Sequence, residues 1–340
     1  MPQEAQLLEL LSCHARVFLF PWSAPAEGTY GRFPADELRA ALFTGLSTAC
    51  GLQFIVTKLL EARGTDKKPV DAKSTSTALA RIERHFYDSV GDKGFLDFAP
   101  MFALVSTILG DNSVASEEEV VQPTTKANKR TKVKLEICSG TGDWVCAQAA
   151  ADTGAHWVAL ELRHDRVYNI LTKAIIEGIP NLSLLRGDAM RILPHIPDGS
   201  VHGLFVNYPE PPQKTGRSEE SGGAVSEGAH LLDEAFFRSV GRVLTSKGSL
   251  TILTDNLWYA KLLVRVIADT AAESGLRSLS PGKCADHQVE FSIGEVHLFR
   301  GLPGPAHGHV AESSSYFDRL WKKGKMDERY FLVLKKRKHE

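Results

Sequence analysis

The chain has 340 residues, of which 43% are hydrophobic and 24% are charged, and its formal net charge is -1. These values are typical of globular proteins, so they exclude the disordered, fibrous and disulfide-scaffold classes. The length allows two modest domains, or one domain with a long appended segment. Because the chain has no net positive charge, any nucleic acid must be bound by a local basic surface.

The cysteines and histidines predict neither a disulfide framework nor a metal site. The 5 cysteines are scattered without CxxC pairs, and the 12 histidines show no HExxH or comparable ligand spacing. We therefore expect a reducing compartment, nuclear or cytoplasmic. No basic region leads into an apolar run at the N-terminus, and no stretch approaches the roughly 18 apolar residues of a membrane span, so we expect neither secretion nor a membrane partner.

Residues 1–110 are predicted to be a helical N-terminal region, for which no motif indicates a role. Apolar residues recur there at helical spacing in Leu7–Leu11, Leu38–Leu60 and Ala78–Phe86, with a further apolar stretch at Phe95–Leu109. Residues 111–131 form a polar run that predicts a solvated linker containing the domain boundary.

Residues 132–340 have a different pattern, in which short apolar runs alternate with amphipathic stretches. This pattern predicts βα units, an α/β fold and a mainly parallel sheet. The predicted strands are Val133–Ile137, His156–Leu160, Leu182–Leu185, Val201–Asn207, Ser249–Thr254, Val289–Phe299 and Arg329–Lys335. A flexible loop is expected at Gly216–Gly228, after the fourth strand, where open α/β sheets bind ligands at the carboxyl ends of their strands.

A glycine-rich turn follows the first predicted strand, within Leu135–Asp143. Gly140 and Gly142 lack Cβ atoms, so the backbone can turn sharply and approach a ligand at the N-terminus of a helix that begins near Asp143. A tight strand-to-helix turn that binds no ligand would have the same residues.

Acidic residues follow the next two predicted strands. Glu161 comes roughly 20 residues after the glycines, where a carboxylate can accept both hydroxyl hydrogens of an adenosine ribose; the alternative is a surface carboxylate. Asp188 can accept a hydrogen of the adenine amino group, with Ala189 leaving room for the ring, or it can cap a helix over Ala189–Leu193. NAD would also suit Glu161, but the turn lacks the three-glycine GxGxxG fingerprint, and the Arg186–Ala189 segment favours S-adenosylmethionine.

In order and spacing, these motifs resemble the tRNA (guanine-N7)-methyltransferase family over about residues 132–336. The segments that carry the resemblance are Glu136–Gly142, Ala159–Arg163, Leu185–Ala189, Pro197–Val201, Phe205–Pro211 and Leu253–Asp255. The resemblance implies a Rossmann-like methyltransferase sheet, mostly parallel with a reversed last strand. It also implies that S-adenosylmethionine is held by Glu136, Gly140, Gly142, Glu161, Arg163, Asp188, Ala189 and Asn207.

The guanine site implied by the resemblance lies beside Asn207–Pro211. Guanine N7 carries an in-plane lone pair and no proton, so methyl transfer needs alignment and desolvation more than a general base. Glu210 aligns with the family's catalytic aspartate and would orient the guanine through its Watson–Crick edge; the alternative is a solvated loop carboxylate. Its extra methylene moves the carboxylate by about 1 Å, which can cost on the order of 10²-fold in rate. The residues implied to bind substrate are Tyr208, Pro209, Lys214, Asp255, Ser314 and Arg319.

Several positions depart from the family pattern. The loop after Pro212 lacks the family's basic run, and Phe317 stands where the family has a glutamate. Cys138 replaces the usual glycine, which is tolerable if its φ is negative, and we expect a small buried side chain and not a reactive thiol. For Asp255, a helix cap and a substrate contact are equally supported.

Basic residues gather near the C-terminus in Arg319–Lys325 and Lys335–Lys338. They predict phosphate contact, a solvated face or, for the second run, a nuclear import signal. The cofactor motifs are better preserved than the substrate site, which leaves three interpretations open. The favoured one is an active tRNA guanine-N7 methyltransferase; the others are a methyltransferase with another substrate, and a poorly active homologue that binds RNA or forms a complex. We expect tRNA as partner, with an accessory protein subunit as a further candidate.

Overall fold

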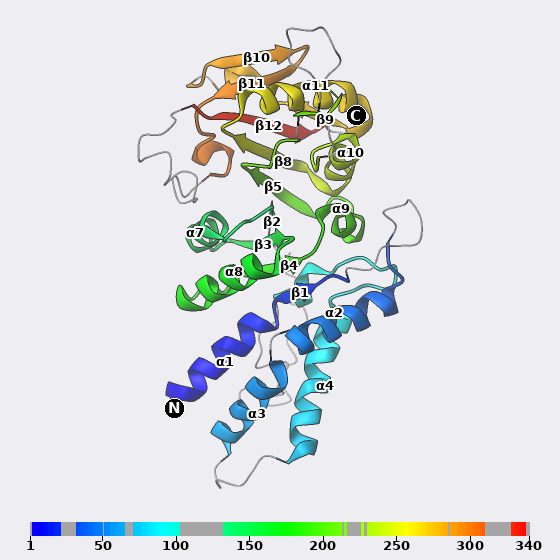
Figure 1. Cartoon of the computed structure of the whole chain (residues 1–340), viewed down its shortest axis with the longest axis vertical. Helices are drawn as coiled ribbons and strands as arrows, with labels where there is room; N and C mark the ends of the chain where they lie inside the picture. Colours follow the sequence, from blue (N-terminus) through cyan, green and yellow to red (C-terminus); the bar gives the residue numbers. More distant parts are fainter. Residues whose placement is uncertain are drawn as a thin grey trace, which may run out of the picture. The chain divides into compact units, whose positions relative to one another are not determined.

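The computed structural model describes residues 2–21, 32–49, 51–64, 71–102, 132–212, 214–215, 226–227, 230–284, 286–309 and 328–337. The chain divides into two compact units that alternate along the sequence. Unit 1 comprises Met1–Val133 and Thr153–His195, and unit 2 comprises Lys134–Asp152 and Ile196–Glu340. Figure 1 shows their helices and strands coloured along the sequence.

Helices account for most of the described N-terminal part of unit 1. They are α1 (Pro2–His14), α2 (Ala35–Ala49), α3 (Leu52–Arg63), α4 (Ala72–Asp88) and the short α5 (Phe98–Met101). The apolar stretch Leu38–Leu60 is thus two helices and not one. The helices are separated at Gly51, whose φ of 58° is a left-handed value that favours glycine.

A short strand, which the sequence analysis did not predict, also lies in this N-terminal region. β1 (Val17–Leu19) pairs in parallel with β4 (Leu182–Arg186), and β4 pairs in parallel with β3 (Ala155–Glu161). With 3 residues, β1 is too short for a period-two pattern to mark it in the sequence. The division into residues 1–110, 111–131 and 132–340 stays a prediction, because 103–131 lie outside the described residues.

Unit 2 contains a mixed sheet. Its strands follow the order β2 (Lys132–Ile137), β5 (Val201–Asn207), β8 (Leu244–Thr254), β12 (Tyr330–Lys336), β11 (Val296–Arg300) and β10 (Val289–Ile293), and β9 (Leu276–Ser278) also pairs with β12. β2, β5 and β8 are parallel, whereas β12 runs antiparallel to β8. The mostly parallel α/β arrangement with a reversed last strand is therefore confirmed.

Two predicted segments of unit 2 differ in detail. The predicted strand Val289–Phe299 is a hairpin of β10 and β11, because the chain turns at Gly294, where φ is 54°. Inside the predicted flexible loop, β7 (Ser226–Glu227) pairs antiparallel with β6 (Lys214–Thr215). The rest of that loop lies outside the described residues.

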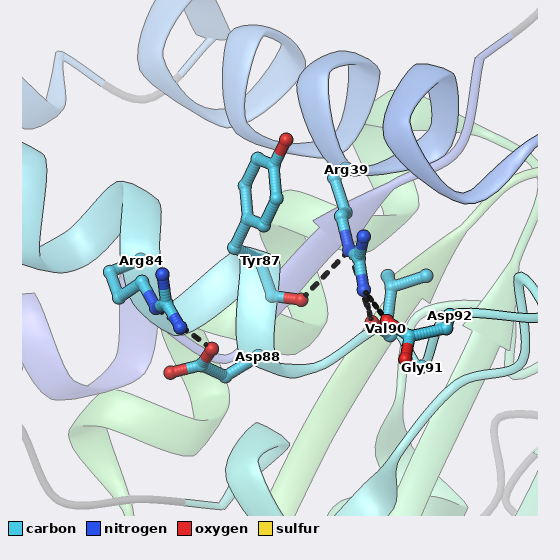
Figure 2. Close-up of a pocket in the computed structure, with 7 residues that line it drawn as sticks. All are labelled: Arg39, Arg84, Tyr87, Asp88, Val90, Gly91 and Asp92. Atoms are coloured by element: carbon cyan, nitrogen blue, oxygen red, sulfur yellow. Dashed lines mark hydrogen bonds and ion pairs between the residues drawn. The ribbon is translucent and has the colours of Figure 1, made fainter.

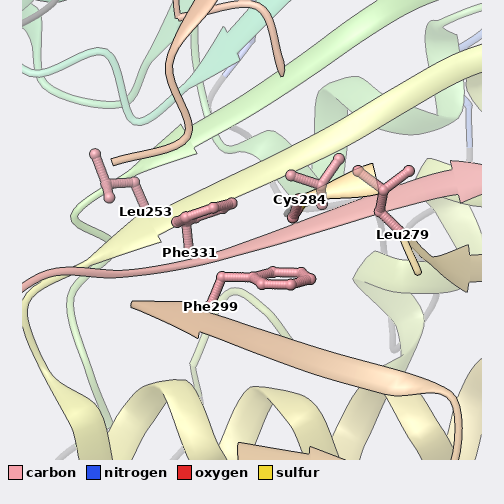
Figure 3. Close-up of a cluster of buried hydrophobic side chains, with 6 residues drawn as sticks. Leu253, Leu279, Cys284, Phe299 and Phe331 are labelled. Carbon is pink, nitrogen blue, oxygen red and sulfur yellow. The ribbon is translucent and has the colours of Figure 1, made fainter. Parts of the chain in front are cut away.

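Helices α10 (Glu234–Val243) and α11 (Leu257–Ser274) pack closely on each other and on the sheet of unit 2. A Cβ atom on Gly241 would lie 1.8 Å from the Ser274 carbonyl oxygen, so only glycine fits at this contact. Apolar side chains pack together around β12, as Figure 3 shows. This apolar cluster consists of Leu253, Leu279, Cys284, Phe299, Phe331 and Val333.

Among the described residues, no single helix is long and apolar enough to cross a membrane. Taken together, α2 and α3 would meet that test by length and composition across a bend of 67°.

Candidate functional site

The glycine-rich turn links β2 to α7 (Asp143–Ala151), so a helix begins at Asp143 as the sequence predicts. Gly140 and Gly142 have φ angles of 58° and 79°, left-handed values that favour glycine. The Gly142 N–H donates to the Ser139 carbonyl at 2.9 Å, which closes the turn. A Cβ atom on Gly140 would meet none of the other described residues within 4 Å, so the space in front of this residue is open.

Cys138 opens this turn, and the structure corrects both expectations about it. Its φ is 61° and not negative, and its side chain is exposed and not buried. The chain must leave β2 and reverse before the first glycine, which places a left-handed residue at the position where the family usually has glycine.

Glu136 and Asn207 form a buried polar pair at the carboxyl ends of two neighbouring parallel strands. Their exposed fractions are 2% and 8%, and the Asn207 Nδ2 donates to Glu136 Oε1 at 2.8 Å. The Asn207 Oδ1 is buried and accepts no hydrogen bond from the described residues. A buried acceptor without a donor costs about 1–3 kcal/mol, so a ligand N–H group placed here would be stabilised. The structure thus brings together two of the residues predicted to bind the cofactor.

Tyr208 and Pro209 begin the loop that follows β5. Tyr208 has a left-handed φ of 52°, its N–H donates to the Leu253 carbonyl at 2.7 Å, and its side chain packs against the apolar cluster. Pro209 is buried, whereas Glu210 is exposed to solvent. Tyr208 and Pro209 therefore anchor the loop, and Glu210 lies at the surface. Direct contact of Tyr208 and Pro209 with a substrate stays a prediction.

Asp255 follows the carboxyl end of β8, and the proposed helix cap at this residue is wrong. The cap of α11 is the next residue, Asn256, whose Oδ1 accepts the Tyr259 N–H at 3.0 Å. Asp255 is half-buried, and burial raises the pKa of its carboxyl group. Substrate contact remains the open interpretation for Asp255.

In unit 1, Glu161 is the last residue of β3 and is only 3% exposed, so the alternative of a surface carboxylate is wrong. Its Oε1 accepts the Arg163 N–H at 3.0 Å, and its carbonyl accepts the Gly187 N–H at 3.1 Å. The second hydrogen bond joins the end of β3 to the turn that leads into Asp188. Two of the predicted nucleoside contacts therefore lie on adjoining turns of the same unit.

The guanidinium group of Arg163 is hydrogen-bonded to Asp165. The Arg163 Nη2 lies 2.9 Å from Asp165 Oδ2, and this hydrogen bond raises the pKa of Arg163. The backbone of Arg163 serves the predicted site by orienting the Glu161 carboxylate, and cofactor contact by its side chain stays a prediction.

Asp188 caps the short helix α9 (Ala189–Ile192), which is followed by the 3-10 turn η1 (Leu193–His195). The Asp188 Oδ1 accepts the Met190 N–H at 2.9 Å, so the capping interpretation is confirmed. Ala189 is buried beside it. The cap uses one carboxylate oxygen, and a contact of the other oxygen with adenine is compatible with it.

Some predicted substrate residues cannot be placed. Ser314 and Arg319 lie outside the described residues, as do Phe317 and the basic stretch up to Lys325. Lys214 is described as part of β6 by its backbone alone. Of the second basic run, Lys336 donates to the carbonyls of Arg242 and Leu244, at 3.3 and 2.8 Å, so it supports the fold.

Sequence reasoning missed an aromatic pair near the glycine turn of unit 2, formed by the buried Tyr259 and the half-buried His230. The Tyr259 hydroxyl lies 3.2 Å from His230 Nδ1, and burial, followed by the nearby Cys138, raises the pKa of Tyr259. No local motif could mark this pair, because its members are 29 positions apart. Within the described part of the chain, no group of His, Cys, Asp and Glu side chains is placed to hold a metal ion.

Figure 2 shows a separate hollow in unit 1, with a volume of about 410 Å³. Its Arg39 donates to the carbonyls of Tyr87 and Val90, and Arg84 pairs with Asp88 at 3.0 Å. These arginines are bound within the protein, so the hollow adds no catalytic group to the candidate site.

Comparison with known proteins gives the same family as the motifs. The family model described as "Putative methyltransferase" matches residues 130–288. The tRNA (guanine-N(7)-)-methyltransferase of Chlamydia trachomatis is 31% identical over 52% of this chain and 73% of its own length. The protein of the same description from Chlamydia muridarum is 34% identical over 44% of this chain and 60% of its own length.

Other relatives are matched over a smaller share of their length, and the solved structures are similar to this chain only at low sequence identity. The chain spans 60% and 54% of the length of the Chlamydia muridarum and Chlamydia pneumoniae relatives. Among solved structures, the 16S rRNA methyltransferase KamB matches with a TM-score of 0.39 and 16% identity, over 61% of this chain and 88% of that chain. The family model spans the glycine turn, and the Chlamydia trachomatis relative is matched over more than two thirds of its own length, so the chain belongs to the tRNA (guanine-N7)-methyltransferase family.

Proposed function

We propose that this chain is an S-adenosylmethionine-dependent tRNA (guanine-N7)-methyltransferase. The observation that carries the proposal is the buried Glu136–Asn207 pair at the carboxyl ends of β2 and β5, next to the glycine turn. Family membership supplies the reaction and the substrate class.

The residues present fit S-adenosylmethionine. In unit 2, the open space at Gly140 accepts a ligand close to the backbone, and the Asn207 Oδ1 offers an acceptor for its ammonium group. In unit 1, Glu161 would accept the ribose hydroxyls and Asp188 the adenine amino group. The cofactor would supply an electrophilic methyl group on a sulfonium.

The protein's part in the reaction is to orient the guanine and to exclude water. Guanine N7 has no proton to lose, so no general base is required at this atom. Glu210 is exposed on an anchored loop, where its carboxylate can accept hydrogens from the Watson–Crick edge of a guanine. A guanine oriented in this way would present its N7 lone pair to the methyl group that the bound cofactor supplies.

The first experiment measures cofactor affinity by calorimetry with S-adenosylhomocysteine. We expect Asn207→Ala and Glu161→Ala to raise Kd by about 10-fold or more, because each removes a polar contact to the ligand. Asn181→Ala is the matched control, since Asn181 is equally buried but donates to the Ala155 carbonyl. Wild-type affinity in Asn207→Ala and Glu161→Ala would remove the cofactor assignment.

The second experiment follows transfer of a tritiated methyl group to tRNA. Glu210→Gln should lower the rate, and Glu210→Asp should raise it, because the shorter side chain restores the family's carboxylate position. Tight cofactor binding by the wild type without transfer to tRNA would instead favour a poorly active homologue that binds RNA or needs an accessory subunit. The poorly active homologue stays a second candidate because Glu210, which is exposed, stands where the family has an aspartate.

A further inference from the structure

Strand β1 brings the N-terminal region directly against the turn that carries Asp188. The Leu19 position of β1 is paired with Arg186, the last residue of β4, and the Phe20 N–H continues the pairing by donating to the Arg186 carbonyl at 2.9 Å. The next residues after Arg186 are Gly187 and Asp188. The N-terminal strand thus ends beside this predicted adenine contact.

Phe20 packs against Gly187. A Cβ atom on Gly187 would lie 3.0 Å from the Phe20 Cβ and 3.1 Å from the Ile192 Cδ1, so the turn is held between these two side chains. Phe20 is buried, and its ring centroid lies 5.5 Å from that of His195. Phe20 therefore contacts both ends of the segment 187–195.

His195, at the far end of this segment, is held by three other backbone groups of the N-terminal region. Its Nδ1 donates to the Gly94 carbonyl at 2.8 Å, and its Nε2 accepts the Phe33 N–H at 3.3 Å. Its carbonyl accepts the Leu96 N–H at 2.7 Å. Because a carbonyl can only accept and an N–H can only donate, these partners select the neutral imidazole with its proton on Nδ1.

Residues 94–96 are themselves held in place by α2. Arg39 of α2 donates to the Val90 carbonyl at 2.6 Å, as Figure 2 shows, and Val90 forms a bridge with Leu96. The contacts of His195 therefore belong to a connected structure that runs through the described N-terminal helices. All these residues lie within unit 1.

We propose that the N-terminal region positions Asp188 for recognition of the adenine amino group, with Phe20 and Phe33 as positioning residues. This inference rests on the proposed function, because it requires a methyl donor with an adenosine moiety. The physical reason is that α9 is a helix of 4 residues, which cannot fix its own capping carboxylate. The contacts of Phe20 and His195 supply the missing rigidity from outside the segment.

The test compares binding of two ligands, S-adenosylhomocysteine and S-inosylhomocysteine, by calorimetry. The second ligand has an oxygen in place of the adenine amino group, so it lacks the hydrogen that Asp188 would accept. We expect the wild type to prefer the adenosine compound by about 10-fold or more. A general loss of stability would lower the affinity for both ligands by the same factor. Misplacement of Asp188 would instead lower the ratio of the Kd for S-inosylhomocysteine to the Kd for S-adenosylhomocysteine.

Phe20→Ala should lose most of this preference while it still binds both ligands. Phe33→Ala, which removes the half-buried ring that stacks on His195 at 5.6 Å, is the milder second variant and the substitute if Phe20→Ala does not fold. Phe54→Ala is the matched control, because Phe54 belongs to the same N-terminal region but is 67% exposed on α3. It should keep the wild-type ratio.

The outcomes separate the inference from the proposed function. If the wild type binds neither ligand, the proposed function fails. If it binds both ligands equally, or if folded Phe20→Ala and Phe33→Ala keep the wild-type ratio, the positioning role is overturned while cofactor binding stands.

Discussion

Among the described residues, two that are not glycine have a left-handed backbone conformation, and both follow parallel strands of unit 2. Cys138 comes directly after β2 and Tyr208 directly after β5, with φ angles of 61° and 52°. Side chains with a Cβ adopt this conformation at a cost of about 1–2 kcal/mol. For Tyr208 the cost is offset by its backbone hydrogen bond to Leu253 and by the apolar cluster. Such strain gathers where a structure holds a ligand-binding turn in shape.

The strain at Cys138 predicts a stabilising substitution. Cys138→Gly should raise the free energy of unfolding by about 0.5–1 kcal/mol, because glycine adopts this φ freely but loses more entropy on folding. Urea denaturation followed by circular dichroism measures the change. Cys138→Ala is the control, since it removes the thiol and keeps the Cβ. Equal stability of Cys138→Gly and Cys138→Ala would show that the thiol, and not the backbone, determines the effect.

At the scale of single elements, β1 is fixed by a buried arginine without a carboxylate partner among the described residues. Arg16 is 5% exposed, and its guanidinium donates to the carbonyls of Ser12, Ile179 and Pro180. Its own carbonyl accepts the Leu184 N–H and the Ser183 hydroxyl, both at 2.8 Å. One side chain therefore ties the end of α1 to the segment that precedes β4.

Arg16→Ala should lower the free energy of unfolding by about 2 kcal/mol, because the buried Ile179 carbonyl and two part-buried carbonyls lose their donor, and an unsatisfied buried acceptor costs about 1–3 kcal/mol. Thermal and urea unfolding both report this loss. Arg84→Ala is the comparison, since the Arg84 side chain is 74% exposed and its ion pair within the described residues is with the surface residue Asp88. Surface pairs of this kind contribute little. A similar loss in Arg84→Ala and Arg16→Ala would contradict the role given to Arg16.

The elements show which parts of the fold the sequence could predict. The strands of unit 2 and α7 follow from apolar runs and from the glycine turn, because these signals are local. Strand β1 could not be found in this way, since its pairing with β4 is set by contacts far along the chain. The turns at Gly51 and Gly294 were visible as glycines, but a glycine inside an apolar run does not reveal its own φ.

In the candidate site, too, the residues that could be predicted are those whose positions depend on local sequence signals. The positions of Glu161 and Asp188 could be predicted because Glu161 ends β3 and Asp188 lies two residues after the end of β4, and apolar runs mark both strands in the sequence. The sequence left a helix cap as one of two interpretations of Asp255, whereas the cap is Asn256, because both side chains can cap a helix and the sequence does not fix where α11 begins. The ion pair of Arg163 with Asp165 is local, but the sequence does not show which partner an exposed arginine takes, and the contact of Arg163 with the cofactor stays a prediction.

At the scale of the whole molecule, we expect buried and half-buried histidines to make stability depend on pH. Burial lowers the pKa of five described histidines below the ordinary value of 6.5. They are His14, His85, His156, His195 and His307. The unfolded chain therefore binds more protons than the folded chain once the pH falls below about 6.5. The stability that these neutral side chains contribute is fully present above that pH and is lost as the pH falls toward their folded pKa values.

The urea midpoint should accordingly be lower at pH 5.5 than at pH 7.5. His195→Gln should reduce this difference, because one of the protonation sites is gone while an amide keeps hydrogen-bonding capacity. A midpoint that is independent of pH in this range, or one that rises in acid, would show that burial of these imidazoles does not control acid stability.

The pairing of β1 with β4 has a consequence for synthesis on the ribosome. Arg16 and Ser183, which are hydrogen-bonded across this pair, are separated by 167 positions. At roughly 5–20 residues per second, the emerging N-terminal strand would wait about 8–33 s before its partner is translated. During that interval its apolar residues are open to chaperones and to neighbouring nascent chains, so slower elongation should lower the yield of native protein.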